Sequence, residues 1–319
     1  MNVCFILMVS IILQLLFGFL MKLLFPGVSS IPFVYYTQLM LLTFVSVFLP
    51  SYLYLKDEKK GYFTDCFSSV KPDILFLISA LIGVCSQYVG ILANLPVRIL
   101  MDYLGADITK NIPQVDSFSK FLFAVFVMCL LPAIFEEVMF RGIVFNYFRQ
   151  FGKRSAIIFS ALLFGIMHFD FTNFFATFLL GLVLGYIISL TNRMVYTMIA
   201  HFMINFTSVL SSYIVNFEIA NNFYIDSLPV LFIVSVPLII YLISLFKQKA
   251  VYMPYHDQVK YETVIENVIP INEESSIKII EHDIRENNMK LAFKKLYTSP
   301  SFYILLMLFI YLGGSDLWK

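Results

Sequence analysis

Residues 135–142 read Phe-Glu-Glu-Val-Met-Phe-Arg-Gly and place three formally charged side chains inside an otherwise apolar run from about residue 121 to residue 148. If that run crosses a membrane, each charge costs at least about 2.5 to 3.5 kcal/mol, so three together need a purpose. On a helix, Glu137 and Arg141 lie four residues apart on one face, in the order that favours an ion pair. Glu136 lies about 100° round the helix and is the carboxylate left free for chemistry.

The composition is that of a membrane protein. The 319 residues are 60% hydrophobic and only 13% charged, whereas soluble domains average about 25% charged residues. The net charge of +1 and the lack of a concentrated basic surface exclude nucleic acid as an expected partner. The four cysteines have no C-x-x-C spacing, which argues against disulfide frameworks and thiolate metal sites.

Apolar runs long enough to cross a bilayer predict an all-α polytopic transmembrane bundle of about eight or nine spans. We expect spans at 3–25, 31–55, 73–95, 118–148, 155–170, 172–191, 194–216 and 228–246, with a shorter one at 301–313. The fifth is short and is closed by Asp170. The first has no basic n-region and no small-residue cleavage site, so we interpret it as an uncleaved anchor.

Basic residues near the span ends indicate the orientation. If successive spans alternate in direction, most of these basic residues fall on one side of the membrane: Lys56, Lys59, Lys60, Lys71, Arg149, Lys153, Arg154, Arg193, Lys247 and Lys249. That side is expected to be the cytoplasm, with the N-terminus and the 247–299 segment inside. We expect an integral protein of the cell membrane.

Four regions follow from these patterns. We expect N-terminal transmembrane helices and an interfacial segment at 1–117, a catalytic core at 118–246, a charged cytoplasmic segment at 247–299 and a short C-terminal span at 300–319. Within the first region, residues 96–117 are amphipathic and fit either a short interfacial helix or a plain loop. Within the third, residues 284–296 combine apolar and basic side chains that could rest on an anionic membrane surface.

Two histidines within the spans add to the acidic pair. His168 ends a predicted span, and His201 lies four residues before Asn205, so these last two side chains project from one helix face. An imidazole and an amide side by side can donate hydrogen bonds to a developing oxyanion. Glu136, held near His168, could take a proton from water. The set predicts acyl hydrolysis by an activated water.

Other chemistries remain as alternatives at this point. Two histidines and a glutamate are a plausible zinc set, which would consist of Glu136, His168 and His201, although H-E-x-x-H is absent. No G-x-S-G segment supports a serine nucleophile, and Cys129 is expected to pack rather than react. A proton-coupled transporter would call for helix-breaking Gly or Pro pairs in two corresponding halves, and no repeat is present.

Three motifs together resemble a known family. E-E-x-x-x-R at 136–141, F-x-x-x-H at 164–168 and H-x-x-x-N at 201–205 occur in this order on successive spans. They are similar to the motifs of the CPBP intramembrane metalloprotease family, the CAAX proteases and bacteriocin-processing enzymes, also called Abi. The glycines of G-x-x-x-G at 181–185 also fit, and would allow close helix packing.

The resemblance implies a membrane endopeptidase similar to the enzyme that trims prenylated C-a-a-X proteins. It implies that Glu136 with His168 activates water, that His201 with Asn205 forms the oxyanion hole, and that Glu137 and Arg141 support them. The family name asserts a metal, but the residues suit a glutamate mechanism at least as well, so we expect no metal, with zinc as the alternative. The expected substrate is a membrane-associated peptide or protein, lipidated or of bacteriocin or pheromone type, reached from the lipid bilayer. The alternative function is a non-catalytic immunity or scaffold protein that uses the same cavity.

Overall fold

The computed structural model describes residues 3–24, 32–58, 72–106, 114–251 and 289–315. Within these ranges every regular element is a helix. Seven helices are long and apolar enough to cross a membrane, or eight if a bent pair near the C-terminus forms one span. The expected all-α transmembrane bundle is confirmed, with seven or eight such helices where eight or nine spans were expected.

The first half of the chain supplies four spans, two of which contain short π-helical pieces. Their elements are α1 (Val3–Leu24); α2 (Pro32–Thr43), η2 (Phe44–Phe48) and α3 (Leu49–Glu58); α5 (Ile74–Tyr103); and α6 (Phe118–Ala124), η3 (Val125–Leu130), α7 (Leu131–Glu137), η4 (Val138–Val144) and α8 (Phe145–Arg149). The second half continues with α9 (Lys153–Ile166), η5 (Phe171–Asn173), α10 (Phe174–Thr191), α11 (Met194–Ile214), α12 (Glu218–Lys249), a helix at Met289–Tyr297 and α15 (Pro300–Ser315).

The fifth expected span is a short helix that does not cross on its own. The 14 residues of α9 reach about 21 Å, less than the roughly 30 Å of a hydrocarbon core. The chain then turns through Phe169, whose φ of 48° is in the left-handed region. Asp170 begins η5 by accepting hydrogen bonds from the Thr172 amide at 3.0 Å and from its hydroxyl at 2.8 Å. The turn before α10 therefore lies at membrane depth.

Two expected boundaries are wrong. The third span does not stop at residue 95, because α5 continues through Pro96 to Tyr103, so the first part of the 96–117 segment belongs to a transmembrane helix. Residues 107–113 lie outside the described residues. The last long span begins at Glu218 rather than 228, because an apolar run marks only the part of a helix in lipid, whereas α12 starts beyond it.

Prolines accompany two of the π-helical segments. Pro132 has no N–H, so the carbonyl of Met128 lacks its usual α-helical donor, and the preceding η3 is π-helical. Pro50 stands in the same relation to Ser46 in η2. A proline in each of these spans thus shifts the hydrogen-bond register of the helix in the turn before it.

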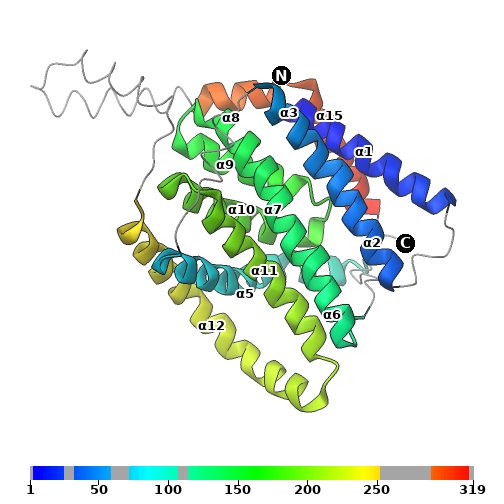
Figure 1. Ribbon diagram of the computed structural model, residues 1–319, viewed down its shortest axis with the longest axis vertical. Helices are drawn as coiled ribbons and strands as arrows, with labels where there is room; N and C mark the ends of the chain where they lie inside the picture. The colour runs from blue at the N-terminus through cyan, green and yellow to red at the C-terminus, as the bar shows by residue number, and fades with distance from the viewer. Residues whose placement is uncertain (1–2, 25–31, 59–71, 107–113, 252–288, 316–319) are drawn as a thin grey trace, which may run out of the picture.

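Two of the helices that carry the motifs, α7 and α11, lie at the centre of the bundle (Figure 1). In this view α7, α10 and α11 run through the middle, with α1, α2, α3 and α15 on one side and α5 and α12 on the other. The central helices are thereby shielded from lipid over much of their surface, which suits the polar residues that they contain.

The C-terminal part forms a bent pair, Met289–Tyr297 followed by α15, with an angle of 72° between them. Ala292 and Leu296 are buried in the same apolar cluster as residues of α1 and α9. The described portion of the expected surface segment 284–296 therefore packs against the bundle, and residues 284–288 lie outside the described residues. Leu291 and Phe293 of this segment stay 43% and 55% exposed, so packing on the protein buries only part of its apolar side chains.

Candidate active site

Glu137 and Arg141 form a fully buried ion pair in the core. Their side chains are 0% and 1% exposed, and Arg141 Nη1 lies 3.1 Å from Glu137 Oε1. The Arg141 guanidinium also donates from Nη2 to the Gly181 carbonyl at 3.4 Å and lies 4.9 Å from the centre of the Phe164 ring. The pair that the sequence spacing predicts is present, and α10 helps to hold its cation.

Asn146 stabilises the π-helical segment in which Arg141 lies. Its side-chain amide donates to the carbonyls of Arg141 at 2.8 Å and of Gly142 at 2.9 Å. These carbonyls lie where η4 departs from the α-helical bonding pattern. Sequence reasoning missed Asn146, although an amide one turn after a charged pair in an apolar run was a usable signal.

His201 contacts both glutamates. Its Nδ1 lies 2.8 Å from Glu137 Oε1, and its Nε2 lies 3.9 Å from Glu136 Oε2. Because a carboxylate accepts, Nδ1 carries a proton and donates to Glu137. The second distance is too long for a direct hydrogen bond and leaves room for a bridging atom. Glu137 thus fixes the imidazole ring, and its Nε2 faces Glu136.

His168 lies apart from Glu136, contrary to the expected pairing. Among the described residues its hydrogen bond is from Nδ1 to the Phe164 carbonyl at 2.7 Å, and no hydrogen bond or ion pair joins it to Glu136. A carbonyl only accepts, so Nδ1 donates and the neutral ring has a lone pair at Nε2. The Phe164 ring lies between the two histidines, with ring centres 4.7 Å from His168 and 5.9 Å from His201.

Asn205 supports a neighbouring helix as well as facing the cavity. Its Nδ2 donates to the Met128 carbonyl at 3.0 Å. This is the carbonyl that Pro132 deprives of its α-helical donor, so the amide replaces a missing main-chain bond. A side-chain amide has two N–H groups, and one remains for another acceptor.

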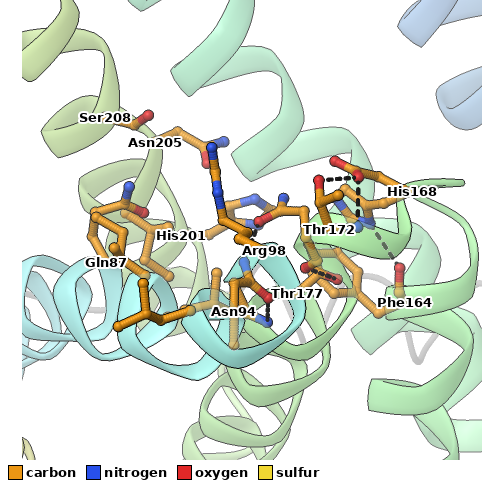
Figure 2. Close-up of a pocket in the computed structure, with 18 residues that line it drawn as sticks. Gln87, Asn94, Arg98, Phe164, His168, Thr172, Thr177, His201, Asn205 and Ser208 are labelled. Atoms are coloured by element: carbon orange, nitrogen blue, oxygen red, sulfur yellow. Dashed lines mark hydrogen bonds between the residues drawn. The ribbon is translucent and has the colours of Figure 1, made fainter. Parts of the chain in front are cut away.

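A cavity of about 770 Å³ brings the two histidines and Asn205 together (Figure 2). Its wall also includes polar residues from α5 and from the start of α10. The residues that line it are Gln87, Gly90, Ile91, Asn94, Leu95, Arg98, Phe164, His168, Asp170, Thr172, Asn173, Ala176, Thr177, Leu180, His201, Ile204, Asn205 and Ser208. Glu136 is not in this wall, and it meets the cavity through His201.

The polar face of α5 was missed by sequence reasoning. Gln87, Asn94 and Arg98 recur at helical spacing along one side of it, and all three line the cavity. Asn94 accepts from the Ala176 amide at 2.8 Å and donates to Asn173 at 2.7 Å, so it fixes the start of α10 beside the cavity. The repeat of Gln, Asn and Arg within an apolar run was the available signal.

The side chains as placed do not form a metal site. Among the described residues, no three His, Cys, Asp or Glu side chains are grouped so that they could hold a metal ion. The three side chains of the alternative zinc set therefore do not converge on one point. Glu136 lies near His201, whereas His168 donates a hydrogen bond to the Phe164 carbonyl. Cys129 is buried and has no role at the cavity.

Comparison with known proteins locates the resemblance in the same part of the chain. No curated protein and no solved structure matches. Residues 118–207, which hold all three motifs and every residue of the predicted site, match a protein-family model. That model describes the type II CAAX prenyl endopeptidase Rce1-like family, so the resemblance to the CAAX proteases is confirmed, and this integral membrane chain is similar in its central helices to a family of proteases.

Proposed function

We propose that this protein is an intramembrane endopeptidase that hydrolyses a peptide bond of a membrane-associated substrate. The observation that supports this best is the arrangement of Glu136, Glu137, Arg141 and His201, four ionisable groups held together at the edge of a polar cavity inside a helical bundle. Polar residues that only join helices contribute about 0.6 to 2 kcal/mol per hydrogen bond, which does not account for so many charges.

Glu136 is the proposed general base. Its side chain is 21% exposed, whereas Glu137 is fully buried and held by Arg141, so Glu136 is the acid that water can reach. Glu136 takes a proton from a water, whose oxygen adds to the substrate carbonyl carbon. Return of that proton to the amide nitrogen lets the C–N bond break and releases a carboxylate and an amine.

His168 shares this activation in the proposal. Its Nδ1 is held by the Phe164 carbonyl, so the Nε2 lone pair can accept a proton or orient the water. In this proposal His168 and Glu136 approach each other when substrate binds, because catalytic contacts often shorten only in the complex.

His201 and Asn205 stabilise the oxyanion in the proposal. Asn205 has an N–H beyond the one used by Met128, and His201 donates from Nε2 when that atom also carries a proton. Glu137 and Arg141 position this ring without touching the substrate, in the way that a buried acid orients a catalytic histidine.

The proposal assigns no step to a metal. Were zinc required, Glu136, His168 and His201 would have to move together to bind it, and it would polarise the carbonyl and acidify a water. The substrate we propose is a peptide or protein attached to the membrane, lipidated or of bacteriocin or pheromone type, in the cell membrane with the N-terminus in the cytoplasm.

The test is cleavage of a lipidated reporter peptide by the purified protein in detergent. Glu136→Gln, His168→Ala and His201→Ala are compared with wild type, each with and without a strong chelator. Glu218→Gln is the matched control, because Glu218 is an exposed acid that does not line the cavity. We expect Glu136→Gln to lower the rate by about 10² to 10⁴-fold, the usual contribution of a general base. The control should keep full activity, and the chelator should have no effect.

Two results would contradict the proposal. Cleavage by Glu136→Gln at the wild-type rate would exclude Glu136 as the general base. Activity that a chelator abolishes and zinc restores would replace the glutamate mechanism by a metal mechanism.

A further inference from the structure

The cavity becomes more exposed along its length from one end to the other. His201, Phe164, Leu180 and Ile204 are buried, whereas Arg98, His168 and Ser208 are exposed. His201 lies seven residues after the start of α11, about 10 Å along the helix axis, and Arg98 lies 24 residues after the start of α5, about 36 Å along it. Both helices start on the same side of the bundle, so the exposed end is the far one.

The opposite end is closed by apolar and small side chains. Between His201 and the start of α11, Thr197 and Met194 are 0% exposed, and Phe145 and Phe148 of α8 are each 1% exposed. The ion pair of Glu137 and Arg141 lies in the same packed layer. In the described bundle, His201 is therefore separated from this end by closely packed, buried side chains.

The two ends differ in charge. The closed end is the one where basic residues collect, at Lys56, Arg149, Lys153, Arg154, Arg193, Lys247 and Lys249. Near the exposed end the described residues include the basic Arg98 and Lys120, together with the acidic Asp102 and Asp116. Excess Lys and Arg in short loops marks the cytoplasmic side.

We propose that the cavity opens on the non-cytoplasmic side of the membrane, so that the bond to be cut reaches Glu136 and His201 from outside the cell or from an equivalent compartment. The substrate class is then an exported or externally exposed segment of a membrane-attached polypeptide, rather than a cytoplasmic C-terminus. The polar lining of the open end, with Gln87, Asn94 and Arg98, is consistent with a water-filled entrance. The opening itself follows from geometry and charge; the kind of substrate rests on the proposed function.

Labelling of single cysteines tests the opening without any need for activity. In a variant in which Cys4, Cys66, Cys85 and Cys129 are replaced by serine, Ser208→Cys marks the open end, and Gln150→Cys marks the closed end at an exposed position. A membrane-impermeant maleimide is applied to right-side-out and to inverted membrane vesicles. Correct folding of each variant is checked by size-exclusion chromatography in detergent.

We expect Ser208→Cys to be labelled in right-side-out vesicles and to lose its label in inverted ones, and Gln150→Cys to show the reverse. The opposite pattern, or equal labelling of both positions from one side, would overturn the proposal. A reporter peptide tethered to either face of the vesicle is the second arm. Cleavage only on the outer face supports the substrate class, and cleavage only on the inner face contradicts it. Labelling as expected, without cleavage on either face, would contradict the proposed peptidase function but would still support the proposed side of the opening.

Discussion

At the scale of single residues, the site contains one carboxylate that is held by other side chains, Glu137, and one that is accessible, Glu136. Glu137 binds Arg141 and His201 at once and is fully buried, while the neighbouring Glu136 remains partly exposed. A single residue step along a helix thus separates a buried acid that holds the His201 ring from the partly exposed acid that we propose as the general base. A buried ion pair contributes little net stability, but removal of one partner leaves an uncompensated charge.

A double-mutant cycle measures this dependence. We expect Arg141→Met to lower the free energy of unfolding by about 3 to 5 kcal/mol, because Glu137 then remains buried without its cation. The double variant Glu137→Gln with Arg141→Met should recover most of that loss, although its activity stays low. Thermal unfolding in detergent gives both values. Losses that simply add in the double variant would show that the two side chains do not compensate each other.

Much of this residue-scale arrangement could be predicted from the sequence, and part could not. The spacing of Glu137 and Arg141 determines their contact, because both lie on one helix. The contact of Glu136 with His201 instead of His168 depends on the rotation of α7 against α11 and on the short turn after α9. Sequence spacing carries no information on such rotations, and the same is true of the bond from Asn205 to Met128.

At the scale of elements, small residues determine how closely the helices of the site approach. At Gly83 of α5, an added Cβ would overlap the Ala200 carbonyl oxygen of α11 and lie 2.8 Å from Met203 Cβ. At Gly181 of α10, an added Cβ would lie 2.7 Å from Ala161 Cα of α9. Since Ala200 directly precedes His201, the contact of α5 with α11 also positions the His201 ring.

Gly83→Ala should therefore affect stability and activity together. We expect a loss of about 1 to 3 kcal/mol in the free energy of unfolding, as for other overpacked sites, and a fall in kcat/KM because α11 is displaced. Gly18→Ala is the matched control, since nothing lies within 4 Å of an added Cβ there. Unfolding in detergent and reporter cleavage provide the two readouts. A Gly83→Ala protein as stable and active as the control would show that α11 has room to move.

The spans illustrate what apolar runs can and cannot predict. A run identifies a helix in lipid, and most expected spans coincide with helices. It does not show where a helix continues into a polar stretch, so α5 and α12 were expected too short. It also does not distinguish a short helix that turns back within the membrane from a complete crossing, as with α9.

At the scale of the whole molecule, the C-terminal helix reaches the turn that carries His168. Phe309 of α15 lies with its ring centre 4.8 Å from that of Phe171 and 5.4 Å from that of Phe174. Gly313 lies close to the Phe169 carbonyl, where an added Cβ would come within 3.2 Å of the oxygen. A segment outside the part of the chain that matches the protease family therefore supports that part.

Phe309→Ala tests this support. In the core of a water-soluble protein, a Phe→Ala change lowers the free energy of unfolding by about 3 to 5 kcal/mol. We expect a smaller loss here, because lipid replaces part of the lost contact. Reporter cleavage should fall as the turn at 167–173 loosens. Ile310→Ala is the control, since Ile310 is 56% exposed and faces away from the bundle. Equal behaviour of the two variants would separate α15 from the site.

The short reach of α9 has a consequence for a peptide that approaches it. Because α9 ends about 21 Å along its axis, less than a hydrocarbon layer of about 30 Å, the turn that carries His168 lies below the membrane surface. An extended peptide drawn toward His168 would have to bring its N–H and C=O groups to that depth. Since each unsatisfied backbone group in lipid costs several kcal/mol, unwinding a substrate there is favourable only where its backbone faces the polar side chains that line the cavity, such as Asn94 and Thr177.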